Sequence, residues 1–225
     1  MSSRRGKGNV GPHAHSERML DLVLPLMCGG CGAPAVRWCD DCACAFSTQP
    51  AVVGTRVDPG VPVLSLGRYA GVRRQAIVTM KDRGRRDLAA PLGVVLARGV
   101  DQLLRWNLIE RPVTLVPAPT RWTAARGRGG DPVTAVAAVA ARMPGVHIAS
   151  LLRMKMGARD SVGLSAAARQ HNVAGRIALR RTARPATELM LVDDVVTTGA
   201  TVAESVRVLE SAGFRVAAAL TLTHS

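Results

Sequence analysis

Four of the five cysteines of this chain form two Cys-x-x-Cys pairs, Cys28/Cys31 and Cys39/Cys42, separated by seven residues. Together they supply the four thiolates that a tetrahedral Zn²⁺ ion requires. A redox-active thiol pair is the alternative, but neither pair follows a strand within a β-α-β unit, as thioredoxin-like motifs do. Few large apolar residues accompany the cysteines, whereas bound zinc contributes on the order of 10 kcal/mol in such sites. We therefore expect a structural zinc knuckle, with Cys44 as a small buried residue.

A second set of residues that could do chemistry lies near the C-terminus, directly after an apolar stretch at 189–192. Asp193 and Asp194 come first, and a turn rich in threonine follows them. Ligands of open α/β sheets bind at the carboxyl ends of the strands. Small side chains, main-chain N–H groups and a helix N-terminus suit a phosphate group, while the two carboxylates can accept hydrogen bonds from sugar hydroxyls. The residues expected to bind the sugar phosphate are Val195, Thr197, Thr198, Gly199, Ala200 and Thr201.

Two other interpretations fit this segment less well. Most Asp-Asp pairs do no more than cap a helix, but here a strand, the acid pair, a Thr-Thr-Gly-x-Thr turn and an amphipathic helix follow one another in order. A nucleoside triphosphate site would require a motif such as G-x-x-x-x-G-K-[ST] or G-x-G-x-x-G, and the sequence contains neither. The pattern favours a site for a phosphorylated sugar, with Asp193 and Asp194 as its catalytic pair.

A framework of alternating strands and helices must position these residues. Short apolar runs such as 113–116 suit buried parallel strands, and Ala/Val-rich stretches such as 133–142 suit helices packed on them. Asp131 followed by Pro132 is a helix start, and Asp87 is the expected N-cap of an earlier amphipathic helix. The alternation predicts an α/β fold with a doubly wound, mostly parallel sheet. The expected strands are 63–69, 113–116, 146–149, 177–179, 189–192 and 216–222, and the expected helices are 72–81, the segment after Asp87, 133–142 and 200–212.

Changes in composition along the chain predict its domain borders. Residues 1–18 are polar, basic and Gly-rich, which is typical of a disordered tail. A long basic stretch at 152–175 is poor in large apolar residues and suggests a mobile loop beside the site. We expect the zinc knuckle at 19–46, a linker rich in Pro, Gly and small residues at 47–62, and the main domain at 63–225, with its core at 113–225.

The chain carries a formal net charge of +14, from 30 Lys and Arg against 16 Asp and Glu. This balance favours anionic partners such as phosphates, pyrophosphate or nucleic acid. Aromatic residues make up only 3% of the chain and are scattered, so binding to nucleic acid would be driven mainly by its phosphates. The sequence shows no export signal and no apolar stretch of about 20 residues that would span a membrane. We therefore expect a cytoplasmic protein.

The segment from Val192 to Thr201 resembles the phosphoribosyl pyrophosphate signature of type I phosphoribosyltransferases. Combined with the four-cysteine knuckle, it makes the chain from about residue 20 to its end similar to the ComF (competence protein F) family. Further carriers of this resemblance are Leu24-Pro25, Tyr69-Ala70-Gly71, Met80-Lys81-Asp82-Arg83-Gly84-Arg85-Arg86, Val116-Pro117-Ala118-Pro119 and the stretch from Leu164-Ser165 to Asn172-Val173. The resemblance implies a type I phosphoribosyltransferase fold that binds phosphoribosyl pyrophosphate with Mg²⁺ and transfers phosphoribose.

The resemblance also implies roles for basic residues and for partners. The acceptor in such proteins is covered by a hood, for which the knuckle and the 81–86 segment, with Lys81 and Arg83, are candidates. The family context is DNA uptake, which implies single-stranded DNA or a DNA-uptake helicase as partner. The sequence does not identify the acceptor. The alternative to an enzyme is a non-catalytic protein that senses a phosphorylated ribose or binds single-stranded nucleic acid. The residues corresponding to the pyrophosphate loop are Pro119, Thr120, Arg121 and Arg128.

Overall fold

The computed structural model describes residues 26–119, 131–155, 175–180 and 185–225. The expected tail at 1–18, the pyrophosphate-loop residues Thr120, Arg121 and Arg128, and most of the expected loop at 152–175 lie outside these residues. In chain order the elements are α2 (Asp40–Ala45), β1 (Ala51–Val52), β2 (Val63–Ser65), α3 (Gly71–Asp82), η1 (Arg86–Leu88), α4 (Ala89–Arg105), β3 (Val113–Pro117), α6 (Pro132–Ala140), β4 (Val146–Ile148), β5 (Leu152–Met154), β6 (Ile177–Leu179), β7 (Glu188–Val196), α8 (Ala200–Ser211) and β8 (Val216–His224).

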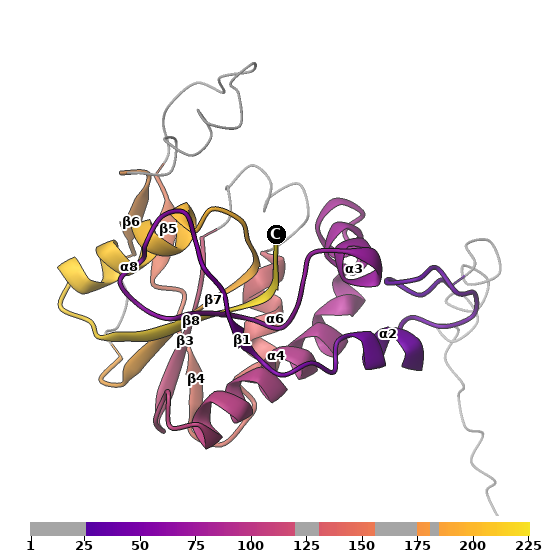
Figure 1. Ribbon diagram of the computed structural model, residues 1–225, viewed down its shortest axis with the longest axis horizontal. Coiled ribbons are helices and arrows are strands. Elements are labelled where there is room, and N and C mark those ends of the chain that lie inside the picture. The colour runs from indigo at the N-terminus through magenta and orange to yellow at the C-terminus, as the bar shows by residue number, and fades with distance from the viewer. Residues whose placement is uncertain (1–25, 120–130, 156–174, 181–184) are drawn as a thin grey trace, which may run out of the picture.

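The main sheet of the described residues has six strands in the order β1-β2-β8-β7-β3-β4 (Figure 1). All neighbouring pairs are parallel except β1 and β2, which are antiparallel. After β3 the chain passes through α6 to β4 on one side, and after β7 it passes through α8 to β8 on the other. The carboxyl ends of β3 and β7 therefore flank the point where the winding direction reverses, which is where open α/β sheets bind ligands.

Helices cover both faces of this sheet. On one face α4 and α6 pack together and contribute apolar side chains such as Leu96 and Val136 to a core shared with β2, β3, β7 and β8. On the other face Val202, Val206 and Leu209 of α8 form a second core with Leu191 and the β5-β6 ribbon. The predicted α/β architecture with a mostly parallel sheet is confirmed, and so is the winding of helices over its two faces.

The central strand β7 extends beyond the apolar run that predicts it. It begins at Glu188 and continues through both acids to Val196, because β8 pairs with it along its whole length, from Leu189 with Val216 to Val196 with His224. The acids thus belong to the end of a strand rather than to the loop after it. The ribbon partner β5 (Leu152–Met154) lies at the start of the stretch expected to be a loop, because it pairs with β6 antiparallel.

Two predicted helix starts have different outcomes. Asp131 is the N-cap of α6, where its carboxylate accepts hydrogen bonds from the Val133 N–H (3.2 Å) and the Thr134 hydroxyl (2.6 Å). Asp87 does not cap a helix, and this prediction is wrong. It lies inside the 3₁₀ turn η1, which continues directly into α4, and its carboxylate pairs instead with the Arg85 guanidinium (2.7 and 2.8 Å).

Residues 47–62, expected to be a linker, contact the main domain. Ala51 and Val52 form β1, the outermost strand of the sheet, which pairs with β2. Further on, the Val57 N–H donates to the carbonyl oxygen of Thr198 at 3.0 Å. This segment therefore touches the threonine-rich turn after β7.

Among the described residues, no helix has the length and apolar character needed to cross a lipid bilayer.

The contact between α4 and α6 gives a test of the packing. A methyl group at Gly93 would lie 2.4 Å from Cβ of Val139 and 2.9 Å from the carbonyl oxygen of Val136. We predict that Gly93→Ala lowers the free energy of unfolding by about 1–3 kcal/mol, because overpacking outweighs the better helix propensity of alanine. Urea denaturation measures this change. Val94→Ala, at an exposed position one residue away, is the control and should change stability by no more than about 0.5 kcal/mol; equal effects of the two substitutions would contradict the packing described here.

Candidate functional site

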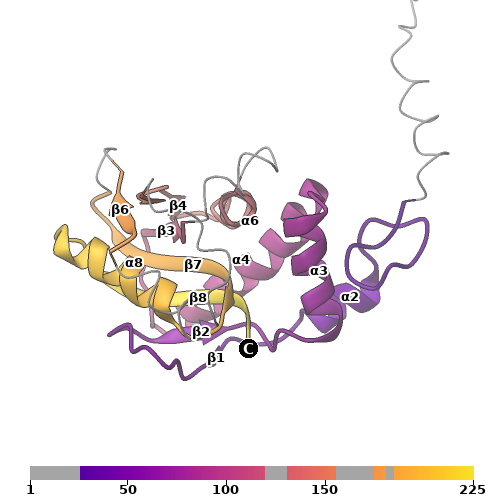
Figure 2. The ribbon, with the colours of Figure 1, turned by 90° about the horizontal axis from the view of Figure 1, so that it is seen from above.

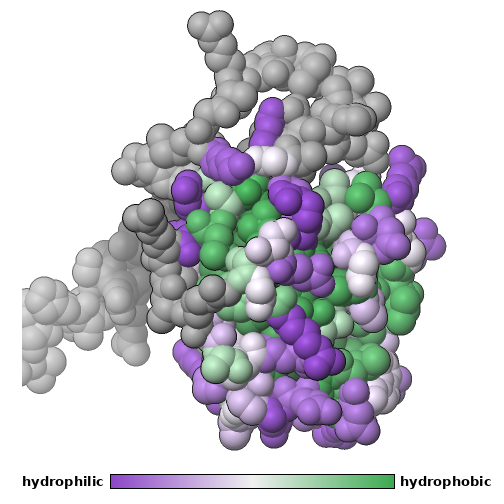
Figure 3. All heavy atoms as spheres, turned by 90° about the vertical axis from the view of Figure 1, so that its left-hand side faces the viewer, coloured by the Kyte–Doolittle hydropathy of each residue, from purple (hydrophilic) through white to green (hydrophobic). Residues whose placement is uncertain are grey.

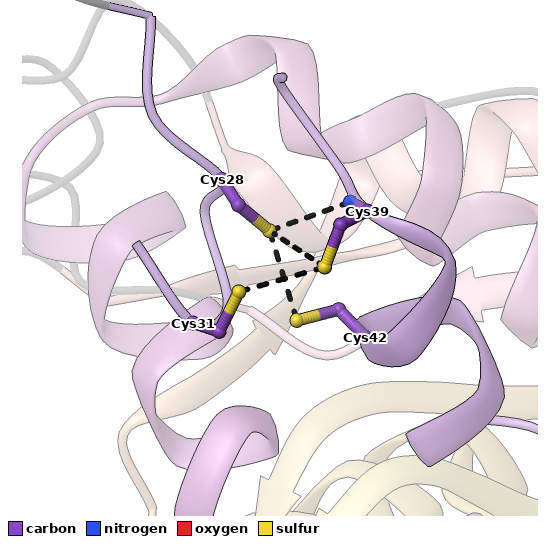
Figure 4. Close-up of side chains that lie close together, drawn as sticks. All are labelled: Cys28, Cys31, Cys39 and Cys42. Carbon is purple, nitrogen blue, oxygen red and sulfur yellow. Dashed lines mark hydrogen bonds between the residues drawn. The ribbon is translucent and has the colours of Figure 1, made fainter. Parts of the chain in front are cut away.

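The four cysteines of the two pairs converge on one point (Figure 4). Their sulfur atoms all lie within 4.8 Å of one another, and three sulfur–sulfur distances are 3.5, 3.6 and 3.7 Å. A tetrahedral zinc ion with Zn–S bonds of about 2.3 Å places its sulfur ligands about 3.8 Å apart. The arrangement of Cys28, Cys31, Cys39 and Cys42 therefore fits the predicted metal centre.

Local backbone structure places these thiols. Cys28 and Cys31 lie in a tight turn closed by the Gly32 N–H on the Cys28 carbonyl oxygen (3.0 Å), while Cys39 is the N-cap of α2 and Cys42 lies in its first turn. The Cys39 N–H donates to the Cys28 sulfur at 3.4 Å. Burial raises the pKa of the Cys28 thiol, but nearby main-chain N–H groups, including that of Cys31, outweigh it and lower this pKa to about 6. The pKa of the Cys42 thiol is raised instead, first by burial and then by hydrogen bonds with neighbouring thiols, so a bound cation would have to stabilise its thiolate.

The knuckle packs against the rest of the protein rather than standing apart. The rings of Trp38 and Phe46 lie 5.5 Å apart, and Phe46 belongs to the core formed with α3 and α4. Figures 1 and 2 both show α3 between the sheet and α2. Cys44 is exposed, so its predicted burial is wrong. Two residues along a helix turn the side chain by about 200°, so Cys44 faces away from the side on which Cys42 is buried.

We predict that the purified protein contains one zinc ion per chain, measured by elemental analysis. Cys39→Ser or Cys42→Ser should abolish zinc binding and lower Tm by about 5 °C or more, because about 1 kcal/mol of lost stability moves Tm by about 2–4 °C in a chain of this size. Cys44→Ser is the matched control and should keep both the zinc and the Tm. Zinc retained by the Cys39→Ser and Cys42→Ser variants, or lost with Cys44→Ser, would contradict this assignment.

The second site lies at the carboxyl end of β7, where the two acids differ in their surroundings. Asp194 is buried, with only 4% of its side chain exposed, and pairs with Lys81 of α3. The Lys81 ammonium group donates to Oδ1 of Asp194 at 2.7 Å and lies 2.6 Å from Oδ2. Asp193 is partly exposed, and its Oδ1 accepts a hydrogen bond from the Asp194 N–H at 2.8 Å. The sequence resemblance makes Lys81 a candidate for the hood over the acceptor but does not predict that it pairs with one acid.

The charged groups of Lys81, Asp193 and Asp194 change one another's pKa values. Partial burial, followed by repulsion from the Asp194 carboxylate, raises the pKa of Asp193 well above its ordinary value, and the Lys81 ammonium group opposes this rise. Burial alone would lower the pKa of Lys81, but attraction to Asp194 outweighs it, so that the pKa of Lys81 is raised. Lys81 therefore stays positively charged at neutral pH.

The turn after the acids bends the chain from β7 into α8. Gly199 has a φ of +83°, which an L-residue rarely adopts, and α8 begins at the next residue. The Thr198 hydroxyl accepts a hydrogen bond from the Ala200 N–H at 3.4 Å. Within the described part of the chain, the N–H groups of Thr198, Gly199 and Thr201 have no hydrogen-bond partner. Thr197 is exposed, and Thr198 and Thr201 are partly exposed, so a ligand can reach them.

One side of this turn is covered by the segment that precedes β2. A Cβ atom on Gly199 would lie 2.6 Å from Cβ of Thr55 and 2.8 Å from the carbonyl oxygen of Val57. Beyond this contact a hollow of about 740 Å³ separates residues 56–60 from α8, and it reaches Ala200. The described residues that line the hollow do not include Asp193 or Thr198, so it is separate from the acid pair. Figure 3 shows the side of the molecule on which α8 lies, where hydrophilic and hydrophobic side chains are mixed.

Of the other predicted site residues, Pro119 lies just after β3, beside a small cavity of about 110 Å³. Arg83 is exposed at the end of α3, and no described acid pairs with it. Two arginines that the sequence analysis did not single out, Arg153 and Arg180, line the same cavity as Pro119. Arg153 lies opposite Ala178 in the β5-β6 ribbon, and the Arg180 guanidinium donates to the Leu152 carbonyl oxygen at 2.9 Å, so contacts between residues far apart in the chain bring both arginines to this cavity.

Comparison with known proteins gives no relative from which to assign these sites. A scan against protein-family models found no match, and a search of curated proteins found none either.

Proposed function

We propose that this protein binds phosphoribosyl pyrophosphate, accompanied by Mg²⁺, and transfers its phosphoribosyl group to an acceptor. One observation carries the proposal: Asp193 and Asp194 lie near the end of β7, and the threonine-rich turn follows them, at the edge of the sheet where the chain leaves β3 and β7 in opposite directions. The proposal includes the type I phosphoribosyltransferase fold and the ComF family that the sequence resembles.

The turn supports the phosphate half of this proposal. N–H groups at the start of α8 carry the positive end of the helix dipole, and the Thr197 and Thr198 hydroxyls stand beside them. The positive φ of Gly199 allows the bend that leads into α8, and its missing side chain leaves room for Thr55 and Val57 on the other side of the turn. In the proposed complex, the 5-phosphate accepts hydrogen bonds from this turn, and the ribose extends toward the carboxylates at the end of β7.

The reaction needs stabilisation of charge more than covalent chemistry. The bond between ribose C1 and pyrophosphate breaks, its electron pair leaves with pyrophosphate, and the acceptor's lone pair forms the new bond to C1 while the acceptor loses a proton. A carboxylate close to the ribose would stabilise the positive charge that develops on the sugar. Positive side chains, among them Arg153 and Arg180 and the predicted Arg121 and Arg128, would receive the pyrophosphate.

Mg²⁺ would enter with the substrate, bound by pyrophosphate oxygens, and would supply electrostatic stabilisation of the leaving group. The acids at the end of β7 are compatible with such a substrate, because Lys81 neutralises one of the two negative charges and limits repulsion of the pyrophosphate. We assign no side chain as a direct Mg²⁺ ligand. The zinc knuckle has a structural role in this proposal and takes no part in the chemistry.

The sequence resemblance also supports a biological setting for this activity. ComF-like proteins are connected with DNA uptake, and the net charge of +14 suits an anionic partner such as single-stranded DNA. We therefore include single-stranded DNA, or a helicase that handles it, as a proposed partner.

Calorimetric titration with phosphoribosyl pyrophosphate and Mg²⁺ tests the proposal. We predict that Asp193→Asn weakens binding by about 10–100-fold, because hydrogen bonds to a charged group contribute about 1.5–3 kcal/mol each. Glu110→Gln, an exposed acid at the opposite edge of the sheet, has the same change of charge and should bind like wild type. A wild-type protein that does not bind this ligand would refute the proposal; binding without pyrophosphate release in a screen of bases and oligonucleotides would refute catalysis and leave a sensor of phosphorylated ribose.

The raised pKa of Asp193 predicts how this binding depends on pH. Only the ionised carboxylate accepts hydrogen bonds from both ribose hydroxyls, and a raised pKa means that this form appears at higher pH than usual. Affinity should therefore increase as the pH rises through the raised pKa of Asp193. Calorimetry between mildly acidic and mildly basic pH measures this trend, and the Asp193→Asn variant should lose it. An affinity that falls with rising pH over this range would contradict the assignment.

A further inference from the structure

Lys81 approaches the acid pair from α3, an element that precedes the strands of the proposed site in the chain. Its ammonium group contacts both carboxylate oxygens of Asp194, at 2.7 and 2.6 Å, and 32% of its side chain remains exposed. The Asp194 carboxylate is almost fully buried, and the backbone at this residue is also held, because the Thr223 hydroxyl donates to the Asp194 carbonyl oxygen at 3.0 Å. This aspartate is therefore fixed from two sides.

We infer that Lys81 is a positioning residue that holds the Asp194 carboxylate away from the sugar, so that Asp193 is the acid that receives the ribose hydroxyls. The inference rests on the proposed function and assigns different roles to two acids that the sequence analysis treated as equivalent. Asp193 is more exposed and has no ion-pair partner among the described residues. Asp194, already neutralised by Lys81, would gain little from contacting a neutral hydroxyl group, because it would have to give up an ion pair.

The structure holds Lys81 firmly enough for this role. Preceding residues of α3, including Ile77 and Met80, are buried in the core. The helix ends at the next turn, where Gly84 has a φ of +65° and the Arg85 N–H donates to the carbonyl oxygen of Thr79 at 3.4 Å. The Arg85 guanidinium donates to the carbonyl oxygen of Met27 at 3.0 Å, next to the first zinc-knuckle cysteine. The end of α3 is therefore attached to the knuckle, and Lys81 does not depend on its own ion pair alone for its position.

The charges around Asp193 make the proposed role of Lys81 measurable, because they link Lys81 to the pH dependence of ligand binding. A lysine that only stabilised the fold would have no such effect. The charged groups that act on Asp193 are Asp194 on the same strand and Lys81 on α3, with Tyr69 as a further titratable group near Lys81. Because the ammonium group favours the ionised form of Asp193, its removal should move the pH dependence of ligand binding to higher pH. Loss of a merely structural contact would lower stability without moving this dependence.

The test is calorimetric titration of the full-length protein with phosphoribosyl pyrophosphate and Mg²⁺ over a range of pH. Lys81→Met should weaken binding by about tenfold or more, because it leaves the buried Asp194 carboxylate unpaired beside an anionic ligand, and should move the pH midpoint of binding upward. Lys81→Arg keeps the positive charge and should restore the wild-type midpoint with part of the affinity. Arg98→Met removes the same charge from an exposed position on α4 and should leave both quantities unchanged.

The outcomes separate this inference from the proposed function. If wild type does not bind the ligand, the proposed function is refuted and the role of Lys81 with it. If wild type binds and Lys81→Met has the same affinity and pH midpoint, only the role of Lys81 is refuted. Should Lys81→Met fail to fold, Lys81→Gln tests the same role, because it removes the charge but keeps a polar side chain: it should weaken binding and move the pH midpoint upward, whereas a wild-type affinity and midpoint overturns the inference.

Discussion

The pairing of β7 with a parallel strand on each side is the interaction on which the rest of this structure depends. Strand β3 pairs with it from Glu188 to Val192, and β8 pairs with it as far as Val196. Because main-chain groups in a buried strand must find hydrogen-bond partners, this pairing determines where the acids lie. The pairing places Asp193 and Asp194 at the carboxyl edge of the sheet, and the turn that follows them leads into α8. The candidate site is a consequence of where the neighbouring strands end.

The N-terminal part of the chain obeys a different constraint. Between Cys28 and Phe46 few large side chains are available for burial, so four thiols close together replace a hydrophobic core. The knuckle still joins the main body through Phe46 and through the contact of Gly29 with Leu88, where a Cβ atom would lie 2.4 Å from the leucine side chain. The described residues therefore give a single packed body, although two kinds of stabilisation act in it.

Local sequence patterns predicted those features that depend on interactions between residues close together in the chain. Two Cys-x-x-Cys pairs predict a metal centre because their spacing limits the geometry, and Asp131-Pro132 predicts a helix start because the cap bonds lie within three residues. Apolar runs located the strands, but their ends depend on partners far away in the chain. That is why β7 extends through Asp193 and Asp194, and why β5 lies where a loop was expected.

Predictions that depended on tertiary contacts were less successful. Asp87 is an exception, because a local contact misled the prediction there: it looks like a helix cap, but the Arg85 guanidinium, two residues before it, binds its carboxylate. The pair formed by Lys81 and Asp194 joins residues 113 positions apart, and no local pattern indicates it. The phosphoribosyl pyrophosphate site and the ComF assignment are inferences from a motif, which indicates chemistry but does not reveal which of two acids is engaged elsewhere.

The segment before β2 has a consequence for how this chain can be divided. Val52 and its neighbour form the outermost strand of the sheet, and residues 55–57 lie against the turn at Gly199. A fragment that started at residue 63 would expose the unpaired edge of β2 to other molecules and would remove one wall from the bend that begins α8. The composition suggests a border there, but the fold does not separate at that point, so residues 51–62 and the domain that follows them must be inherited and engineered as one unit.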